Sequence, residues 1–180
     1  MRETSEGRIS GRIVETEAYE PDDASCHAFR GKSRANAALF ARRGTAYVYM
    51  AYGSSWMLNL ASEREGVGAG VLIRALEPLE GIELMQRFRG TTTLRDLTRG
   101  PGRLAEALNI DRRFDGVDLC TEGPLWLGTA SAKTGRIGVS ERIGISRETH
   151  RPLRFFEIGS RFVSGPRALN AQDAATRAGM

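Results

Sequence analysis

The most regular pattern in the chain is a polar–apolar alternation over residues 8–19. In a strand, this alternation places Glu15, Glu17 and Tyr19 on one face. A Pro-Asp-Asp turn at residues 21–23 ends the pattern. Similar β-forming stretches predict further strands over residues 45–51, 56–61, 71–76, 125–127, 137–139 and 153–158, with the glycine-rich run 66–70 as one of the turns.

Helical periodicity predicts three helices, over residues 36–43, 79–88 and 101–108. Residues 170–180 have only a weak pattern and should form a frayed tail. In the second helix, Leu79, Ile82 and Met85 form the apolar stripe, and Pro101 suits the first turn of the third. No linker, repeat or low-complexity tract divides the chain. We therefore expect one mixed α+β domain over residues 1–180, with a largely antiparallel β-sheet flanked by helices.

Composition is ordinary for a globular protein with a core, since 41% of the 180 residues are hydrophobic and 27% are charged. The formal net charge of +4 and the pI of 9.5 favour a polyanionic partner. All basic residues except Lys32 and Lys133 are arginines, which suit bidentate phosphate contacts. A bias in genome composition explains the arginines equally well.

Several features argue against other classes of protein. Cys26 and Cys120 lie far apart in the sequence and make no disulfide framework, and no Cys or His spacing suggests zinc. The polar N-terminus does not resemble a signal peptide, and no apolar run approaches the roughly 20 residues that cross a bilayer. We expect a cytoplasmic protein in a reducing environment, without contact with a membrane.

Residues 15–59 combine acids, bases and tyrosines in a way that suits an enzyme acting on a nucleic-acid base. All four tyrosines lie there, whereas residues 24–62 contain no acid and five basic residues. Either Glu15 or Glu17 could act as a general base, although an ordinary solvent-exposed face is the alternative. The tyrosines could pack in the core or stack on an extruded base. Tyr52, beside a glycine, is a candidate wedge between base pairs.

The run 99–103 is the best candidate for a phosphate contact. A glycine-rich turn that meets a helix start between two arginines can grip a phosphate through Gly100, Gly102 and Arg103. A plain helix start is equally compatible with the same residues.

A metal site is an alternative use of the acids. Asp22, Asp23 and His27 follow Glu15 and Glu17, and these side chains could serve a metal-dependent hydrolase. Such a site requires the loop to fold back on the strand, whereas a Pro-Asp-Asp turn needs no metal. We therefore predict no metal ion.

Taken in order, these residues resemble the alkyladenine (3-methyladenine) DNA glycosylases. The matching motifs are Arg12-Ile13-Val14-Glu15-Thr16-Glu17-Ala18-Tyr19, His27, Asn36, Gly44-Thr45-x-Tyr47-Val48-Tyr49-x-x-Tyr52-Gly53, Asn59, Val71-Leu72-Ile73-Arg74-Ala75-Leu76-Glu77-Pro78, Gly100-Pro101-Gly102-Arg103-Leu104, Arg142-Ile143-Gly144-Ile145 and Arg151-Pro152-Leu153-Arg154-Phe155. Any one motif is weak, but the ordered set covers nearly the whole chain and is highly specific. The resemblance implies a base-excision repair enzyme that flips a damaged purine out of double-stranded DNA and hydrolyses its N-glycosidic bond.

The resemblance also implies roles for single residues. Glu17 matches the glutamate that activates the attacking water, and Arg74 matches a residue that helps to hold that water and the carboxylate. The other matches are Tyr19, His27 and Tyr49, which enclose the flipped base, Asn59, which disfavours the 2-amino group of guanine, and Tyr52, which fills the gap in the duplex. The family needs no metal or organic cofactor.

Two further expectations concern the reaction and the assembly. A glycosylase that also cuts the strand needs an amine nucleophile. Only Lys32 lies in the motif region, and nothing matches it to that role. We expect a monofunctional enzyme that leaves an abasic site and acts as a monomer.

The chain departs from the family's pattern at three places. A further N-terminal segment with a helix usually precedes the first strand, and we expect it to be absent here. The family's Thr-Pro-Arg-Asn run reads Ser-Arg-Ala-Asn at residues 33–36, so its arginine contact with DNA would pass to Arg34. Ser54 and Ser55 replace aromatic residues seen in some members, which should loosen the loop that carries Tyr52.

A non-catalytic protein that binds damaged DNA on the same scaffold is the alternative function. Binding alone needs neither Glu17 nor Arg74, so their presence favours an enzyme. Release of free 3-methyladenine from alkylated DNA separates the two functions.

Overall fold

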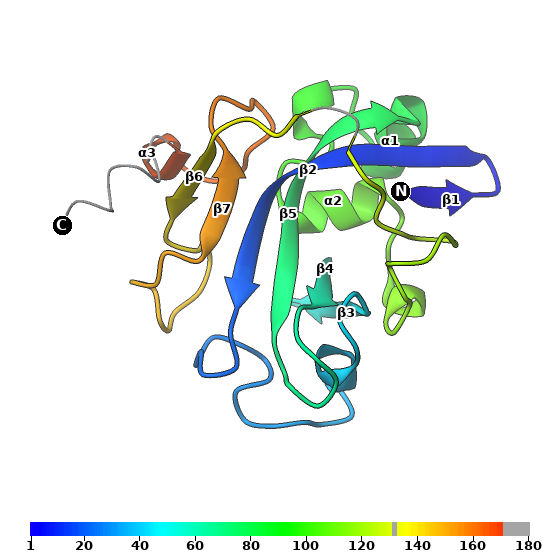
Figure 1. Ribbon diagram of the computed structural model, residues 1–180. Helices are drawn as coiled ribbons and strands as arrows, with labels where there is room; N and C mark the ends of the chain where they lie inside the picture. The colour runs from blue at the N-terminus through cyan, green and yellow to red at the C-terminus, as the bar shows by residue number, and fades with distance from the viewer. Residues whose placement is uncertain (131–132, 171–180) are drawn as a thin grey trace.

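Two long antiparallel strands form the centre of the molecule, β2 (Gly7–Tyr19) and β5 (Gly70–Glu80). They lie side by side through the middle of the computed structural model in Figure 1, which describes residues 1–130 and 133–170. The alternating sequence of β2 predicted this strand, and the structure confirms it. Its length matters because β2 carries Glu15, Glu17 and Tyr19 towards one end of the sheet.

Five further strands complete a seven-stranded sheet in which every pairing is antiparallel. These strands are β1 (Arg2–Thr4), β3 (Ala46–Ala51), β4 (Ser55–Ala61), β6 (Ile137–Ser140) and β7 (Arg154–Glu157). The order is β3-β4-β5-β2-β7-β6, and β1 pairs with β2 off this path. The β3–β4 pair therefore flanks β5, and the later strands β7 and β6 flank β2.

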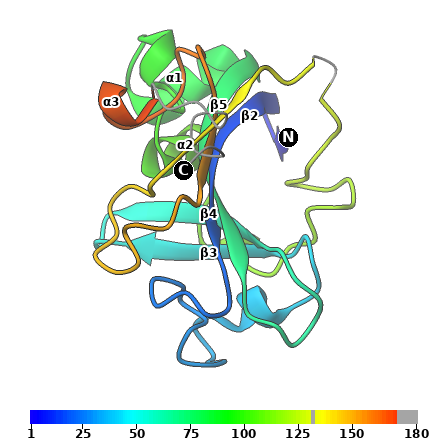
Figure 2. The same cartoon turned by 60° about the vertical axis from the view of Figure 1, so that its left-hand side comes forward.

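The α-helices lie in the upper half of Figure 2, and the connection 20–45 lies at the bottom. Three α-helices are described, α1 (Ile82–Arg89), α2 (Pro101–Ala107) and α3 (Arg167–Asn170). Short 3-10 helices cover Ala37–Phe40, Leu94–Asp96 and Arg112–Phe114. No helix in the described parts of the chain is long and apolar enough to span a bilayer. The mixed α+β fold with an antiparallel sheet is confirmed.

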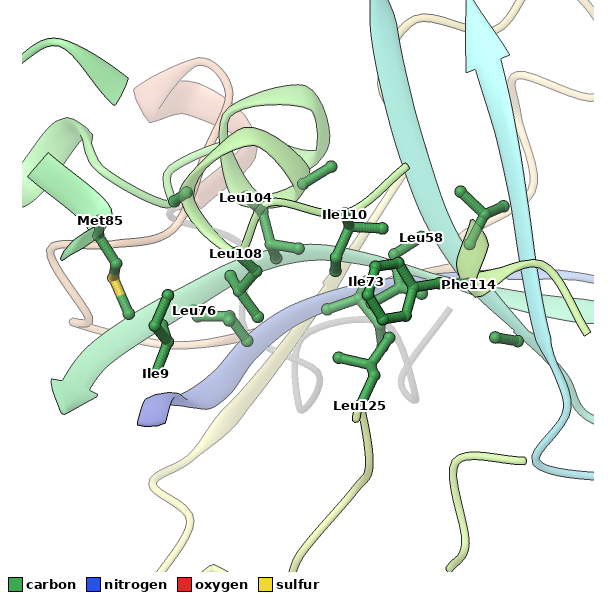
Figure 3. Close-up of a cluster of buried hydrophobic side chains, with 14 of the residues drawn as sticks. Ile9, Leu58, Ile73, Leu76, Met85, Leu104, Leu108, Ile110, Phe114 and Leu125 are labelled. Atoms are coloured by element: carbon green, nitrogen blue, oxygen red, sulfur yellow. The ribbon is translucent and has the colours of Figure 1, made fainter. Parts of the chain in front are cut away.

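The largest hydrophobic cluster lies between the sheet and helices α1 and α2 (Figure 3). Leu104 and Leu108 reach from the helical side towards Ile73 and Leu76 of β5, and Met85 of α1 closes one end. Burial of these side chains fixes the helices on the sheet, at roughly 1.5–3 kcal/mol for each large apolar side chain. The cluster therefore anchors α2, whose first residue, Pro101, borders the candidate site described below.

The helix predicted over residues 79–88 begins only at Ile82 in the structure. Strand β5 continues through Pro78, which pairs with Gly11, to Glu80, which pairs with Ser10. Gly81 then adopts a left-handed φ of 68° and turns the chain into α1. Pairing with the long β2 overrode the turn signal of Pro78, and Leu79 is exposed rather than part of the apolar stripe.

The predicted strand at 125–127 is wrong. Leu125 forms only an isolated bridge with Arg2. The residues beside it bond to Met1, to Glu3 of β1 and to Leu119, without forming a strand. Leu125 and Trp126 are buried, so burial in the core rather than strand pairing accounts for this apolar segment. The predicted helix at 36–43 shortens to a single 3-10 turn. Most of the predicted tail, residues 171–180, lies outside the described residues.

Candidate active site

A cavity of about 520 Å³ opens where the ends of the central strands meet the segment 143–145. Six predicted site residues line it, namely Tyr19, His27, Tyr49, Tyr52, Asn59 and Arg74. They come from β2, from the connection that follows it, from β3 and its turn, and from β4 and β5. The fold therefore brings together side chains that are up to 55 residues apart in sequence.

Glu17 is fully buried and is bonded to residues that line this cavity. Its Oε1 accepts a hydrogen bond from the backbone N–H of Ile143 at 2.8 Å, and its Oε2 accepts one from the Tyr19 hydroxyl at 3.0 Å. Burial and the neighbouring charge of Glu17 raise the pKa of Tyr19, so its hydroxyl stays protonated and donates. Both of these partners line the cavity, so they hold the carboxylate at its wall.

Arg74 connects the two glutamates of β2. Its Nη1 lies 3.1 Å from Glu17 Oε2, and its Nε donates to Glu15 Oε1 at 3.0 Å. Burial alone would raise the pKa of Glu15, but the guanidinium groups of Arg74 and Arg154 and the N–H of Ser164 lower it, so the group is ionised. The prediction that both glutamates face the same side is confirmed by their shared partner, although both are buried rather than solvent-exposed.

Three aromatic rings form one wall of the cavity. The rings of Tyr47 and Tyr49 stack with centroids 5.4 Å apart, as their alternate positions on β3 predicted. His27 packs edge-on against Tyr49 at 4.4 Å, and its Nδ1 lies 2.9 Å from the Tyr47 hydroxyl. Burial raises the pKa of Tyr49 and lowers the pKa of His27, so both are neutral at pH 7. This wall offers an uncharged surface for a flat ring.

Asn59 occupies the β4 side of the cavity and is buried. Its amide nitrogen donates to the carbonyl oxygen of Tyr47 at 3.3 Å, across the β3–β4 pair. This bond fixes the orientation of the amide group. The side chain thus presents a polar group at a defined place on the cavity wall.

Tyr52 stands at the rim, in the turn that joins β3 and β4. It is 84% exposed and has a φ of 54°, a left-handed conformation that few residues other than glycine adopt. Gly53 follows with a φ of 68°. The Tyr52 hydroxyl donates to the carbonyl oxygen of Gly144 at 3.3 Å, on the opposite rim. A large exposed aromatic in a strained turn has no role in the core.

Comparison with known proteins identifies the family. The family model described as methylpurine-DNA glycosylase (MPG) matches residues 1–161. The chain belongs to the methylpurine-DNA glycosylase family. Members of this family are DNA glycosylases, enzymes that hydrolyse N-glycosyl bonds, and the resemblance drawn from the ordered motifs is confirmed.

Curated relatives carry names that agree with this family. A protein of Mesorhizobium japonicum is 62% identical over 94% of this chain and 81% of its own length. One of Paraburkholderia phytofirmans is 53% identical over 94% of this chain and 79% of its own, and one of Rubrobacter xylanophilus is 47% identical over 96% and 90%. Each bears the name "Putative 3-methyladenine DNA glycosylase".

The residues expected to touch phosphates are not among those that line the cavity of this glycosylase, although Gly100 and Gly102 flank Pro101, which does line it. Arg34 is exposed in the connection between β2 and β3, and Arg103 pairs with Asp96 at 3.0 Å on the surface of α2. The backbone N–H of Gly100 donates to the carbonyl oxygen of Arg74. Gly102 packs so closely on β4 that an added Cβ would lie 3.0 Å from that of Ser55. These four residues remain predicted phosphate contacts.

Sequence reasoning missed several residues that support the glycosylase site. Ile143 acts through its backbone N–H, which no side-chain pattern reveals. Arg142, just before it, forms a buried ion pair with Asp23, and its guanidinium lies 4.6 Å over the Tyr19 ring. Arg154 and Ser164 both bond to Glu15. The motifs at 142–145 and 151–155 belonged to the family match, which was the available signal.

The residues of the metal alternative are not brought together. Within residues 1–130 and 133–170, no group of three or more His, Cys, Asp and Glu side chains could hold a metal ion. Asp22 is exposed near Arg151, Asp23 pairs with Arg142, and His27 contacts Tyr47. Each acid that was considered as a ligand is therefore paired with an arginine.

Proposed function

We propose that this chain flips an alkylated or deaminated purine out of double-stranded DNA and hydrolyses its N-glycosidic bond with a water activated by Glu17, leaving an abasic site. One observation carries the proposal. Glu17 is buried, paired with Arg74, and held by two groups that line an aromatic cavity large enough for a base. A buried carboxylate beside a base-sized pocket suits general base catalysis.

The reaction requires few further groups from the protein. A purine alkylated on a ring nitrogen is cationic and leaves readily, so the sugar develops oxocarbenium character in the transition state. Glu17 takes a proton from water as the water oxygen bonds to the anomeric carbon, while the C–N electron pair leaves with the base. The negative charge of the carboxylate also stabilises the sugar cation. Arg74 pairs with the carboxylate and holds it in place.

The cavity walls would select the base. His27 and the stacked Tyr49 offer flat uncharged surfaces on which an extruded purine stacks. Asn59, with its amide oriented by the Tyr47 carbonyl, would disfavour the 2-amino group of guanine. Discrimination then combines the shape of the pocket with the lower cost of extruding a damaged, weakly paired base.

The exposed rim of the cavity would contact the duplex. Tyr52 would fill the gap that the flipped base leaves, as apolar wedges do between base steps. The net charge of +4 favours the phosphate backbone, with Arg34, Arg103, Gly100 and Gly102 as the proposed contacts. We propose that one copy of the chain acts alone, in the bacterial cytoplasm where the chromosome lies.

Glu17→Gln tests the proposal. The amide keeps the shape of the side chain but cannot take a proton, so we expect the single-turnover rate of 3-methyladenine release to fall by about 10²–10⁴-fold. Affinity for the same duplex, measured by fluorescence anisotropy, should change less than about twofold. Glu77→Gln is the matched control, because it alters a glutamate–arginine pair of β5 that is remote from the cavity.

Three results would contradict the proposal. A near-normal excision rate for Glu17→Gln would remove the general base. Tight binding of alkylated DNA by the wild type without base release would favour the non-catalytic alternative. Strand cleavage without alkali treatment would show lyase chemistry and overturn the monofunctional assignment. A panel of 3-methyladenine, 7-methylguanine, hypoxanthine and ethenoadenine duplexes then defines the lesion range.

A further inference from the structure

The guanidinium of Arg74 is divided between two carboxylates. Its Nε donates to Glu15 Oε1 at 3.0 Å, and its Nη1 lies 3.1 Å from Glu17 Oε2. A planar guanidinium has fixed donor directions, so the partner of Nε sets the direction in which Nη1 points. The contact of Arg74 with the proposed general base thus depends on Glu15.

We propose that Glu15 is a positioning residue for catalysis, which holds the Arg74 guanidinium so that only one of its donors reaches Glu17. This inference rests on the proposed role of Glu17 as the general base. Neither glutamate lines the cavity, but the partners of Glu17 all do. Of the partners of Glu15, only Arg74 lines the cavity, and Arg154 and Ser164 do not. The effect of Glu15 on the reaction must therefore pass through Arg74.

Glu15 is itself held by residues outside β5, including one on β7, the strand on the other side of β2. Arg154 of β7 donates from Nε to Glu15 Oε1 at 2.7 Å, while Ser164 donates its backbone N–H to Oε2 at 2.6 Å and its hydroxyl to Oε1 at 2.9 Å. Arg154 is fully buried and is bonded in turn to Ser140 and Asn170. Glu15 therefore has few alternative positions.

The same arrangement balances the buried charge. Two carboxylates, Glu15 and Glu17, face two guanidinium groups, Arg74 and Arg154, and all four side chains are at least nine-tenths buried. Because Arg154 compensates Glu15, the positive charge of Arg74 remains available to Glu17. Buried charges without such partners are strongly unfavourable.

Loss of the Glu15 charge would leave the far side of the Arg74 guanidinium with only the long bond from its Nη2 to the Ser164 hydroxyl, at 3.4 Å. The guanidinium would then turn towards the remaining carboxylate, Glu17, and pair with it through two donors, the geometry that arginine and carboxylate prefer. Glu17 Oε1 and Oε2 already accept the Ile143 N–H and the Tyr19 hydroxyl. A second arginine donor would occupy the lone pairs that an attacking water needs.

Glu15→Gln is the first test. We expect the single-turnover excision rate at saturating enzyme to fall by about 10–100-fold, since displacements of about 1 Å in a catalytic group have effects of this size. The dissociation constant for lesion DNA should change less than about twofold, because no surface that meets DNA is altered. Glu77→Gln, whose partner is Arg12, again serves as the control and should excise at the wild-type rate.

A double-mutant cycle with Arg74→Lys shows whether Glu15 acts through Arg74. Lysine lacks the fixed fork, so in that background Glu15→Gln should change the excision rate by less than about threefold, and the two effects should not multiply. If Glu15 only stabilised the fold, its substitution would lower the melting temperature and leave the rate of folded enzyme unchanged. Multiplicative effects would also overturn the inference.

Two measures keep the test decisive. If Glu15→Gln does not fold, Glu15→Asp retains the charge but withdraws the carboxylate by one methylene, and we expect a rate loss of about 5–10-fold at unchanged affinity. A wild-type rate for folded Glu15→Asp would then overturn the inference. Base release by the wild type and its loss in Glu17→Gln are measured first, so failure of the proposed function is distinguished from failure of this inference.

Discussion

Glu15 and Glu17 are the same residue type, two positions apart on one strand, yet their surroundings differ. Glu15 is bonded to two arginines and to Ser164, and lies away from the cavity. Glu17 has one arginine, and its other partners line the cavity. Partners rather than exposure distinguish the two residues, because both are fully buried. This difference makes Glu17 the better candidate for the base.

Tyr52→Ala tests the wedge at the residue scale. The side chain is 84% exposed and bonds only weakly to Gly144, so its removal should leave the free energy of unfolding within about 0.5 kcal/mol of the wild type. We expect excision from a paired lesion to fall by about 10-fold or more, since unstacking costs a few kcal/mol without a wedge. Excision of an unpaired lesion should fall much less. Equal losses on both substrates would exclude the wedge role.

At the scale of elements, the short helix α2 links the core to the cavity. Its residues Leu104 and Ala105 are fully buried against the sheet, while Pro101 at its start borders the cavity. Gly102 allows the helix to approach Ser55, close to the turn that carries Tyr52. The packing of this helix therefore supports the rim of the site.

Leu104→Ala should lower the free energy of unfolding by about 2–5 kcal/mol, because it removes a fully buried side chain from the main cluster. Urea denaturation followed by circular dichroism measures the change. The matched control is Glu106→Ala on the same helix, which removes a half-exposed carboxylate paired with Arg89 and should cost about 1 kcal/mol or less. Equal costs would mean that the helix does not anchor the fold.

At the scale of the whole molecule, the site joins distant parts of the chain. The bond from Ser164 to Glu15 spans 149 positions, and that from Ile143 to Glu17 spans 126. The antiparallel order places β7 beside β2, so Arg154 reaches Glu15 from the side opposite to Arg74. Stability of the sheet and geometry of the site are thus coupled through one buried charge cluster.

This coupling predicts how stability depends on pH. Burial opposes ionisation of Glu15, but its arginine partners prevail, and its pKa in the folded state lies below the ordinary value of 4.5. A carboxyl with a lower pKa in the folded state binds fewer protons than in the unfolded state. Its contribution to stability is therefore complete above pH 4.5 and is lost as the pH falls through the folded-state pKa.

We expect the free energy of unfolding of the wild type to decrease as the pH falls below about 4.5, and that of Glu15→Gln to decrease less over the same range. Urea denaturation at a series of pH values measures both profiles. The control is Leu104→Ala, which lowers the stability but removes no ionisable group, so its profile should run parallel to that of the wild type. Parallel profiles for the wild type and Glu15→Gln would contradict the assignment.

The sequence by itself determined most of the strands, the helix α2 and the family. Alternation in β2 and β3, the apolar pattern of α2 and the ordered motifs were sufficient for the antiparallel α+β fold and for the site residues that line the cavity. Such signals are local or depend on side-chain identity, so they can be read along the chain. The extension of β5 through Pro78 could not be predicted in this way, because it depends on pairing with β2.

Only the tertiary structure decided which groups surround the two glutamates. The N–H of Ile143 is a backbone group that every residue except proline has, so the residue type does not predict its role. Arg154 and Ser164 meet Glu15 because of strand order and register, which depend on packing across the whole sheet. The sequence was sufficient to name residues that line the cavity, whereas the division of Arg74 between Glu15 and Glu17 required the folded chain.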